Sequence, residues 1–325
     1  MYKIVLIGAG QLGSRHLQGL LNIKLPVSIE VVDPSKDSLE LAKQRAGEME
    51  INANVKEIVY KTALDDLSPE VDIAIIASTS NTRFRIIEKL VSVARVKNLV
   101  LEKILFQCEK EYELTSKILV ENNINCWVNC PRRLFPVYQD IKKLVKTNEK
   151  LTYTVLGGEW GLACNAIHFI DHMNFLNGDD DFAFDIRGIT DVFESKRKGF
   201  YELAGSLKAT QPNGSELFLH SRKTSTAGVQ IQILSDSFFW QIDELRGQLT
   251  TSSRENNWTP LISTFNSPYQ SQLTNLICES ILLDNEVQLI KYETSQKLHL
   301  QMLDAFLRIF DNKSLKTVDG GCPIT

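Results

Sequence analysis

The glycines between residues 8 and 13 have a spacing that could bind the pyrophosphate of a dinucleotide. The segment reads Gly-Ala-Gly-Gln-Leu-Gly. Gly8 permits a tight turn, Gly10 leaves room for a phosphate close to the backbone, and Gly13 lets the following helix approach the preceding strand. The phosphates would then lie at the helix N-terminus, where unpaired N–H groups and the helix dipole attract anions. The predicted phosphate-binding residues are Gly8, Ala9, Gly10, Gln11, Leu12 and Gly13.

An acidic residue follows at the distance expected for a ribose contact. Asp33 lies twenty residues after Gly13, at the end of the apolar and β-branched run 28–32. A carboxylate at this place can bind the hydroxyls of the adenosine ribose. Because its charge would repel a 2′-phosphate, we expect NAD rather than NADP, although Ser35 and Lys36 could reduce that repulsion.

Two later strand ends carry polar residues that could reach the same cofactor. The runs 71–77 and 98–101 have the continuous hydrophobicity of parallel strands covered on both faces. Ligands of such sheets lie beyond the carboxyl ends of the strands. The first run is followed by small polar residues that could instead form an ordinary helix N-cap. After the second run, Lys103 would point toward the nicotinamide, or it is a solvated lysine. The residues predicted to line the cofactor site are Ser78, Thr79, Asn81, Glu102 and Lys103.

The elements that must position these residues form an α/β fold. A strand over 3–7 and a helix over 14–21 flank the glycines, which predicts an N-terminal Rossmann domain, with a doubly wound parallel sheet, over residues 1–125. The remainder, 126–325, is predicted to be an α+β domain with a large, mostly antiparallel open sheet for substrate binding and oligomerisation. Its expected strands cover 151–156, 216–221, 228–235 and 238–245, and its expected late helices cover 269–283 and 294–310.

Composition agrees with a two-domain globular enzyme. The chain has 325 residues, which exceeds what one core usually supports, and its formal net charge is -4. No Lys/Arg run is long enough to follow a phosphate backbone, so we expect no nucleic-acid partner. The N-terminus lacks the pattern of a secretory signal and no segment has the length of a membrane span, so we expect a cytoplasmic protein. The cysteines are scattered, which favours reduced thiols. Cys126 and Cys130 lack a second ligand pair, so we expect no metal.

Several motifs in order give the chain a resemblance to a known family. The glycine segment continues into Arg15 and His16, and 79–81 reads Thr-Ser-Asn. Glu-Lys-Ile follows at 102–104, and His-x-x-Asp lies at 168–171. Together these segments resemble the Gfo/Idh/MocA family of glucose-fructose oxidoreductase and inositol dehydrogenase, over nearly the whole chain.

The resemblance implies that Lys103 and His168 flank the carbon that exchanges hydride with the nicotinamide. Oxidising a secondary alcohol needs a base for the hydroxyl proton and a cation to stabilise the developing alkoxide. Imidazole suits the first role and ammonium the second. A satisfied buried histidine remains the alternative for His168. The further substrate-binding residues predicted are Arg133, Trp160, Cys164 and Asn165; for Arg133 a structural ion pair, and for Trp160 a core position, are equally open readings.

Two positions depart from the family pattern. Cys164 stands where many members carry an Asp four residues before the His, which could alter the proton relay. Ile104 replaces the Pro of Glu-Lys-Pro, so the loop must be held otherwise. We therefore carry two hypotheses. The first is an NAD-linked oxidoreductase acting on a hydroxyl or keto carbon of a sugar, cyclitol or nucleotide sugar, and forming homodimers or homotetramers as the resemblance implies. The second is a cofactor-binding regulator or sensor without turnover.

Overall fold

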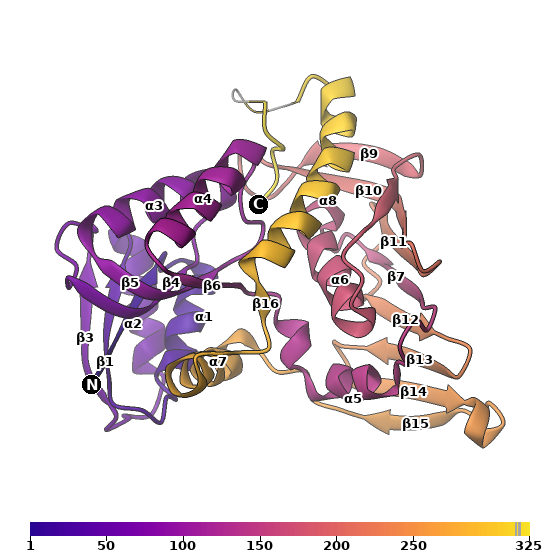
Figure 1. Cartoon of the computed structure of the whole chain (residues 1–325), viewed down its shortest axis with the longest axis horizontal. Coiled ribbons are helices and arrows are strands. Elements are labelled where there is room, and N and C mark those ends of the chain that lie inside the picture. The colour runs from indigo at the N-terminus through magenta and orange to yellow at the C-terminus, as the bar shows by residue number, and fades with distance from the viewer. Residues whose placement is uncertain (316, 318–319) are drawn as a thin grey trace. The chain divides into compact units, whose positions relative to one another are not determined.

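The computed structural model describes residues 1–315, 317 and 320–325, and the chain divides into two compact units (Figure 1). The first unit comprises Met1–Leu134 and Pro268–Glu293. The second comprises Phe135–Ser267 and Thr294–Thr325. Helix α8 (Tyr292–Asn312) begins in the first unit and continues through the second.

A twisted sheet forms the centre of the first unit. Its strands run in the order β16-β6-β5-β4-β1-β2-β3 among the described residues, and all neighbours are parallel except β16 beside β6. Strands β1 and β4 are neighbours although β2 and β3 separate them in sequence, so the strand order reverses there. The strands are β1 (Tyr2–Ile7), β2 (Val27–Val32), β3 (Val55–Lys61), β4 (Glu70–Ile76), β5 (Arg95–Leu101), β6 (Asn125–Val128) and β16 (Ile290–Lys291).

Helices cover this sheet because its central strands are apolar on both faces. Residues 4–7 of β1 and 73–76 of β4 are buried throughout. Such strands need cover on each side, which the crossover helices of parallel sheets provide. The helices are α1 (Gln11–Leu20), α2 (Lys36–Gly47), α3 (Ser80–Val93), α4 (Glu109–Glu121), the short 3-10 helix η1 (Pro131–Leu134) and α7 (Gln270–Asp284).

The second unit contains a larger, mostly antiparallel sheet. Within the described part of the chain its order is β15-β14-β13-β12-β7-β11-β10-β8, with β9 paired to β10, and β7 and β11 form a parallel pair. Its elements are α5 (Pro136–Leu144), β7 (Thr152–Gly158), α6 (Leu162–Asn177), β8 (Ala183–Asp185), β9 (Ile189–Glu194), β10 (Tyr201–Thr210), β11 (Glu216–Arg222), β12 (Gln230–Leu234), β13 (Phe238–Asp243), β14 (Gln248–Ser253), the 3-10 helix η2 (Arg254–Asn256) and β15 (Leu261–Thr264).

Alternation along these strands explains how the sheet is covered. Tyr153 and Val155 of β7 are fully buried, as are Ile231 and Ile233 of β12, whereas the residues between them are more exposed. The apolar face therefore supplies the core of this unit, and α6 packs against β10 and β11 (Figure 1). The expected fold class, a parallel Rossmann sheet followed by a mostly antiparallel sheet, is confirmed.

The division of the chain differs from the expected boundary between residues 125 and 126. Strand β6 begins at Asn125 and extends the first sheet beside β5, so the first unit continues to Leu134. The helix expected over 269–283 is present as α7, but it packs against α1 and belongs to the first unit. Side-chain periodicity specified that helix, whereas its packing partner depends on contacts remote in sequence.

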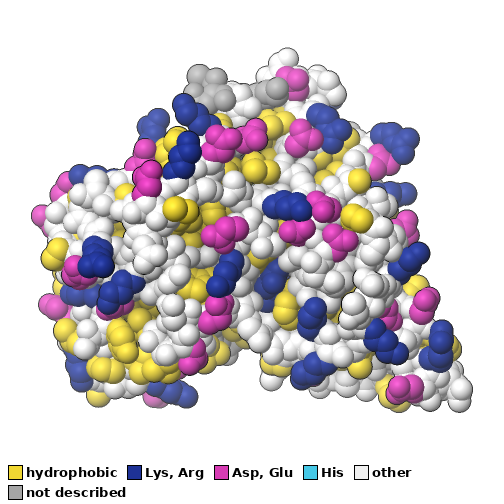
Figure 2. Space-filling view, viewed as in Figure 1, with side chains coloured by type: hydrophobic (Ala, Val, Ile, Leu, Met, Phe, Trp, Pro, Cys, Tyr) yellow, Lys and Arg dark blue, Asp and Glu magenta, His cyan; other side chains and the backbone are white. Residues whose placement is uncertain are grey.

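Charged residues of both signs are mixed on the surface. Figure 2 shows Lys and Arg interspersed with Asp and Glu over the described residues of the visible face, without an extended patch of one sign. A search of the described residues finds no helix with the length and hydropathy needed to cross a membrane.

Candidate functional site

The glycine turn between β1 and α1 has the geometry that its sequence predicts. Gly8 has φ +93°, and a Cβ there would lie 2.9 Å from the carbonyl of Ala77. A Cβ on Gly13 would lie 1.8 Å from the carbonyl oxygen of Gly8, so only glycine lets helix and turn approach this closely. A Cβ on Gly10, in contrast, would meet nothing within 4 Å. Open space therefore borders the turn at the residue where a phosphate was expected.

The N-terminus of α1 also fits an anionic ligand. Gly10 is the N-cap residue, no side chain caps the helix, and its first turn contains no acidic residue. The first N–H groups of a helix have no partner within it, and the helix dipole places partial positive charge there. The segment 8–13 thus has both the space and the donors that a pyrophosphate needs.

Asp33 is held beside this turn by two backbone donors. Its Oδ2 accepts the N–H of Ala9 at 2.7 Å, and its Oδ1 accepts the N–H of Ser35 at 2.8 Å. A carboxylate has further acceptor positions on both oxygens, which fit the hydroxyls of a ribose. The structure therefore brings Asp33 to the glycine turn, as the spacing predicted.

Arg45 is a residue of this region that the sequence analysis missed. Its guanidinium donates to Oε1 of Gln11 at 2.6 Å and to Oγ of Ser14 at 2.5 Å. A cation is thereby fixed at the first turn of α1, where it adds to the attraction for phosphate. No local pattern signals this contact, because α2 carries Arg45 past α1 only in the folded chain.

The polar residues after β4 form a turn that starts α3. Thr79 is the N-cap residue of α3, but its side chain makes no cap hydrogen bond and instead donates to Oδ1 of Asn81 at 2.7 Å. Both residues, like Ser78, lie just beyond the carboxyl end of β4, which is next to the end of β1. Ligands of parallel sheets lie at this edge, which is also where the strand order reverses.

Glu102 occupies the carboxyl end of β5 with its side chain turned into the protein. It is 4% exposed, and its Oε1 accepts from Nδ2 of Asn129 at 2.5 Å and lies 2.9 Å from Nε2 of His16. Burial alone raises the pKa of Glu102, but the hydrogen bond and charge of His16, together with Asn129 and Lys103, outweigh it and lower the pKa. Glu102 is thus a buried carboxylate that anchors the strand end carrying Lys103.

His16, which follows the glycine segment on α1, belongs to this buried network. Its Nδ1 lies 3.0 Å from Oγ1 of Thr274 on α7, and its Nε2 contacts Glu102. The ring therefore connects α1 to β5 and to α7. These three elements are far apart in sequence, so only the fold reveals the connection.

Arg83 holds the segment that follows Lys103. This side chain of α3 is 1% exposed, and it donates to the carbonyl oxygen of Leu105 at 2.7 Å. It also donates to the carbonyl oxygens of Ile104 and Ser78. A buried guanidinium thus ties together the ends of β4 and β5. It supplies the restraint that we expected to be needed where Ile104 replaces a proline.

In the second unit, three of the predicted substrate residues share one side of α6. This helix is buried at most positions, but Cys164, Asn165 and His168 are half-exposed. Positions separated by three and four residues lie on the same side of a helix. The side of α6 that is open therefore carries a thiol, an amide and an imidazole.

Trp160 and Asn165 stabilise the start of α6. The indole Nε1 of Trp160 donates to the carbonyl oxygen of His220 at 2.8 Å, and its ring contacts Phe169 edge-on. The amide of Asn165 donates to the carbonyl oxygen of Trp160 at 2.7 Å. Both side chains are therefore held in place before any substrate binds. Arg133, also predicted to bind substrate, is half-buried in η1 of the first unit.

The neighbouring polar residues of α6 are directed into the core. Asp171 and His172 are buried, and Nδ1 of His172 lies 2.8 Å from the hydroxyl of Tyr153. Neither residue was assigned a catalytic role from the sequence, and His172 acts as a hydrogen-bonding residue of the core.

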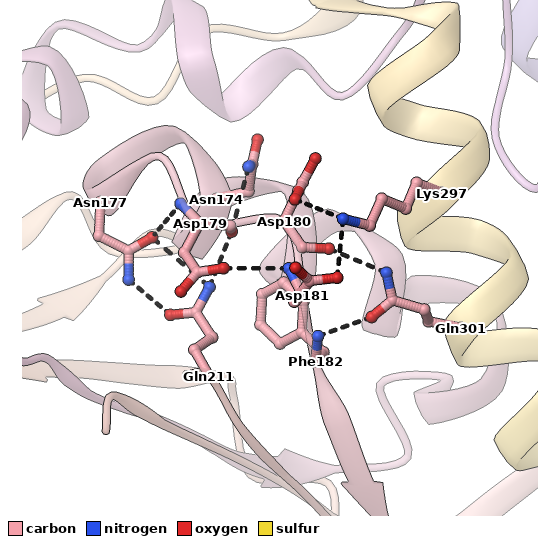
Figure 3. Close-up of polar contacts among 9 residues, drawn as sticks. All are labelled: Asn174, Asn177, Asp179, Asp180, Asp181, Phe182, Gln211, Lys297 and Gln301. Carbon is pink, nitrogen blue, oxygen red and sulfur yellow. Dashed lines mark hydrogen bonds and ion pairs between the residues drawn. The ribbon is translucent and has the colours of Figure 1, made fainter. Parts of the chain in front are cut away.

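Three neighbouring carboxylates in the loop after α6 are explained by ion pairs rather than by a bound metal. Asp179, Asp180 and Asp181 bring carboxylate oxygens within 4.8 Å of one another. Figure 3 shows Lys297 of α8 reaching this loop, where its Nζ lies 2.7 Å from a carboxylate oxygen of Asp180 and of Asp181. The ammonium pairs with both carboxylates and offsets one of their two negative charges, so ion pairs connect this loop to α8.

Comparison with known proteins agrees with this arrangement. Residues 2–129 match the GFO_IDH_MocA family, described as an oxidoreductase family with an NAD-binding Rossmann fold. A search of curated proteins gives no match.

Solved structures with the same fold cover nearly the whole chain. Scyllo-inositol dehydrogenase from Lactobacillus casei is 17% identical with a TM-score of 0.68, over 96% of this chain and 98% of that one. UDP-N-acetylglucosamine 3-dehydrogenase from Acidithiobacillus ferrooxidans is 15% identical with a TM-score of 0.69, over 93% and 95%. An oxidoreductase from Agrobacterium radiobacter, solved with NAD+, L-tartaric acid and magnesium, is 15% identical with a TM-score of 0.70, over 93% and 94%.

The glycine turn, the acid at the end of β2 and the match over residues 2–129 lead to one conclusion. Residues 2–129 form a domain that matches the GFO_IDH_MocA oxidoreductase family and its NAD-binding Rossmann fold.

Proposed function

We propose that this protein is a dehydrogenase or reductase that transfers hydride between NAD and a hydroxyl or keto carbon of a sugar, cyclitol or nucleotide sugar. The observation that carries the proposal is the partly exposed side of α6, where Cys164, Asn165 and His168 lie on a helix that is buried at most of its other positions. A core helix that exposes a polar side to solvent or ligand is better explained by a binding role than by packing.

His168 and Lys103 each have a separate role in the proposed reaction. Nicotinamide, when bound, accepts or donates the hydride. His168 takes the proton from the substrate hydroxyl during oxidation and returns it during reduction. The ammonium of Lys103 stabilises the negative charge that develops on the same oxygen. Lys103 and His168 therefore flank the reacting carbon in the proposed mechanism.

The other residues hold the cofactor and the substrate. Segment 8–13 binds the pyrophosphate, and Asp33 binds the adenosine ribose, which favours NAD over NADP. Ser78, Thr79 and Asn81 line the cofactor site at the end of β4, and Glu102 positions Lys103. Trp160 offers an aromatic surface to a sugar ring, while Arg133, Cys164 and Asn165 contact its substituents.

The substrate class is inferred from the fold relatives. Two of them are named as dehydrogenases of scyllo-inositol and of UDP-N-acetylglucosamine. Both names describe secondary alcohols on six-membered rings, and hydroxyl-rich substrates suit the amide and imidazole of α6.

A second candidate is a sensor that binds NAD without turnover. It is favoured by Cys164, because a thiol at this position of α6 is a poorer partner for a catalytic imidazole than a carboxylate would be. Both candidate functions use the same cofactor site, but only the dehydrogenase transfers hydride to or from a substrate.

Absorbance of NADH distinguishes them. The purified chain would be mixed with NAD and one substrate at a time: scyllo-inositol, myo-inositol, glucose or UDP-N-acetylglucosamine. NADH formation would be followed at several pH values. Saturable NADH formation with one of these supports the dehydrogenase. Tight NADH binding in calorimetry without any turnover in either direction supports the sensor, and no binding of NADH or NADPH would contradict both.

A further inference from the structure

The guanidinium of Arg45, in the last turn of α2, is held by three acceptors at the first turn of α1. Nη1 donates to the carbonyl oxygen of Gln11 at 3.1 Å and to Oγ of Ser14 at 2.5 Å. Nη2 donates to Oε1 of Gln11 at 2.6 Å. A guanidinium has five N–H donors, so two remain for solvent or a ligand. Arg45 is half-buried, and its head group is therefore fixed in place while still open to water.

The protein does not balance the charge of this guanidinium. Its acceptors are a carbonyl, an amide and a hydroxyl oxygen, which are all neutral, and no carboxylate of the described residues forms an ion pair with Arg45. The first turn of α1 contains no acidic residue either. Because a helix N-terminus already carries partial positive charge, a cation beside it is unfavourable unless an anion joins them. An anion is thus the group that would complete this arrangement.

The contact with Arg45 also determines what the side chain of Gln11 does. Gln11 directly follows Gly10, where a Cβ would meet nothing within 4 Å. A glutamine in the first turn could use its amide oxygen to accept the unpaired N–H groups of the helix. In this structure that oxygen accepts from Arg45 instead, and no side chain caps α1. Arg45 therefore keeps the helix N–H groups available to a ligand.

We propose that Arg45 is a positioning residue for the diphosphate of the dinucleotide: it attracts the diphosphate by charge and holds Gln11 away from the N–H donors that bind it. This inference rests on the proposed cofactor site, but not on hydride transfer. The diphosphate carries two negative charges, which meet the helix dipole of α1 and the guanidinium supplied by α2. The affinity for the cofactor thus depends on a residue outside the glycine segment.

Dependence on salt separates this role from a purely structural one. The attraction between partly exposed charges is screened as the ionic strength rises, because the Debye length shortens from about 10 Å at 0.1 M to about 3 Å at 1 M. A loss of affinity caused only by a displaced loop or a missing neutral hydrogen bond would have no such dependence. The effect of removing the charge of Arg45 should therefore shrink in concentrated salt.

Arg45→Gln tests the proposal, because it removes the charge and keeps an amide that can donate one hydrogen bond. We expect the Kd of NADH, measured by calorimetry, to rise by about fivefold in 25 mM NaCl and by less than about twofold in 500 mM NaCl. Arg45→Lys retains the charge and should stay within about twofold of the wild type at both concentrations. Lys56→Gln, at the exposed amino end of β3, changes the net charge equally and should leave the Kd unchanged.

A second readout uses the wild-type chain and does not depend on the folding of a variant. An anion beside a guanidinium favours its charged form, which does not react with phenylglyoxal. Saturating NADH should therefore slow the modification of Arg45 by about threefold or more, as followed by peptide mass spectrometry. Arg95, exposed at the amino end of β5, is the internal control and should react at the same rate with and without NADH.

The outcomes distinguish the role of Arg45 from the proposed function. Arg45 would lose its assigned role if Arg45→Gln left the Kd unchanged in 25 mM NaCl, if its effect were equal at both salt concentrations, or if NADH gave Arg45 no protection. Each of these results would leave the dehydrogenase intact. Failure of the wild-type chain to bind NADH would overturn both proposals, whereas binding without turnover would contradict only the dehydrogenase.

Discussion

Lys103 and His168 carry the proposed chemistry, and each can be replaced by a residue of similar size that lacks its ionisable group. Replacing Lys103 with Met keeps most of the length of the side chain but removes the ammonium. Replacing His168 with Asn removes the imidazole that acts as the base. We expect kcat/KM to fall by about 10²–10⁴-fold in either variant, which steady-state kinetics would measure. Lys97→Met, at an exposed lysine within the preceding strand β5, is the control for Lys103→Met. Full activity of either variant would show that the assigned residue is not catalytic.

Asp33 is the residue on which cofactor choice depends. Its carboxylate is fixed by Ala9 and Ser35, and Asp33→Ser removes the charge that would repel a 2′-phosphate. We expect NADH to bind more weakly and NADPH more tightly, so that their Kd ratio changes by about tenfold or more. Calorimetry with both nucleotides measures this ratio, and Asp37→Ser in the exposed first turn of α2 is the control. An unaltered ratio would argue against the ribose contact.

At the scale of elements, Arg83 joins the ends of β4 and β5. Its guanidinium bonds three backbone carbonyl groups, so Arg83→Met would leave these buried acceptors without their donor. We expect a loss of about 3 kcal/mol in the free energy of unfolding, together with weaker NADH binding, because both loops border the proposed cofactor site. Urea denaturation of this variant and of Arg85→Met, an exposed arginine of the same helix, would measure the difference. Equal stability of the two variants would contradict the role of Arg83.

The pair of His16 and Glu102 links α1, β5 and α7 and makes stability depend on pH. Because the pKa of Glu102 is lowered from 4.5 by folding, its contribution is complete above pH 4.5 and is lost as the pH falls toward the folded-state pKa. We expect the free energy of unfolding to decline below pH 4.5 in the wild-type chain and to decline less steeply in Glu102→Gln. Denaturation between pH 3 and pH 7 would measure this, with exposed Glu88→Gln as the control. Parallel curves for wild type and Glu102→Gln would refute the linkage.

At the scale of the molecule, one face of the second sheet remains exposed and partly apolar. The strand register places Leu156, Leu234 and Ile262 on the same face, and they are 39%, 44% and 80% exposed. This is the face opposite to the one that packs on α6, and we expect it to pair with a second copy of the chain, forming a homodimer or homotetramer.

Light scattering coupled to size exclusion tests the assembly. The single chain has a mass of 36.8 kDa, so a dimer or a tetramer is easily recognised. Leu234→Glu and Ile262→Glu should shift the protein toward the monomer, because a charge at the centre of an apolar interface is costly to bury. Lys110→Glu, an exposed residue of α4 in the first unit, serves as a charge-change control. A wild-type chain that remains a monomer at high concentration would contradict the prediction.

The sequence alone was sufficient for what is encoded within one strand, turn or helix. The glycines of segment 8–13 and the acid at Asp33 belong to one βαβ unit, so their spacing determines how they meet. The alternation of the later strands likewise predicted the antiparallel sheet. These features depend on residues that are close in sequence, so the sequence pattern is enough to predict them.

Only the tertiary structure decided which distant residues meet. His16 contacts Glu102 and Thr274, Arg83 replaces the restraint of a missing proline, and Arg45 reaches the start of α1. That α7 belongs to the first unit could likewise not be predicted from the sequence. Each of these contacts depends on how elements pack, and side-chain packing is selected by the whole core at once. Local periodicity identifies which elements form, whereas the buried polar contacts between elements emerge only when the elements are assembled.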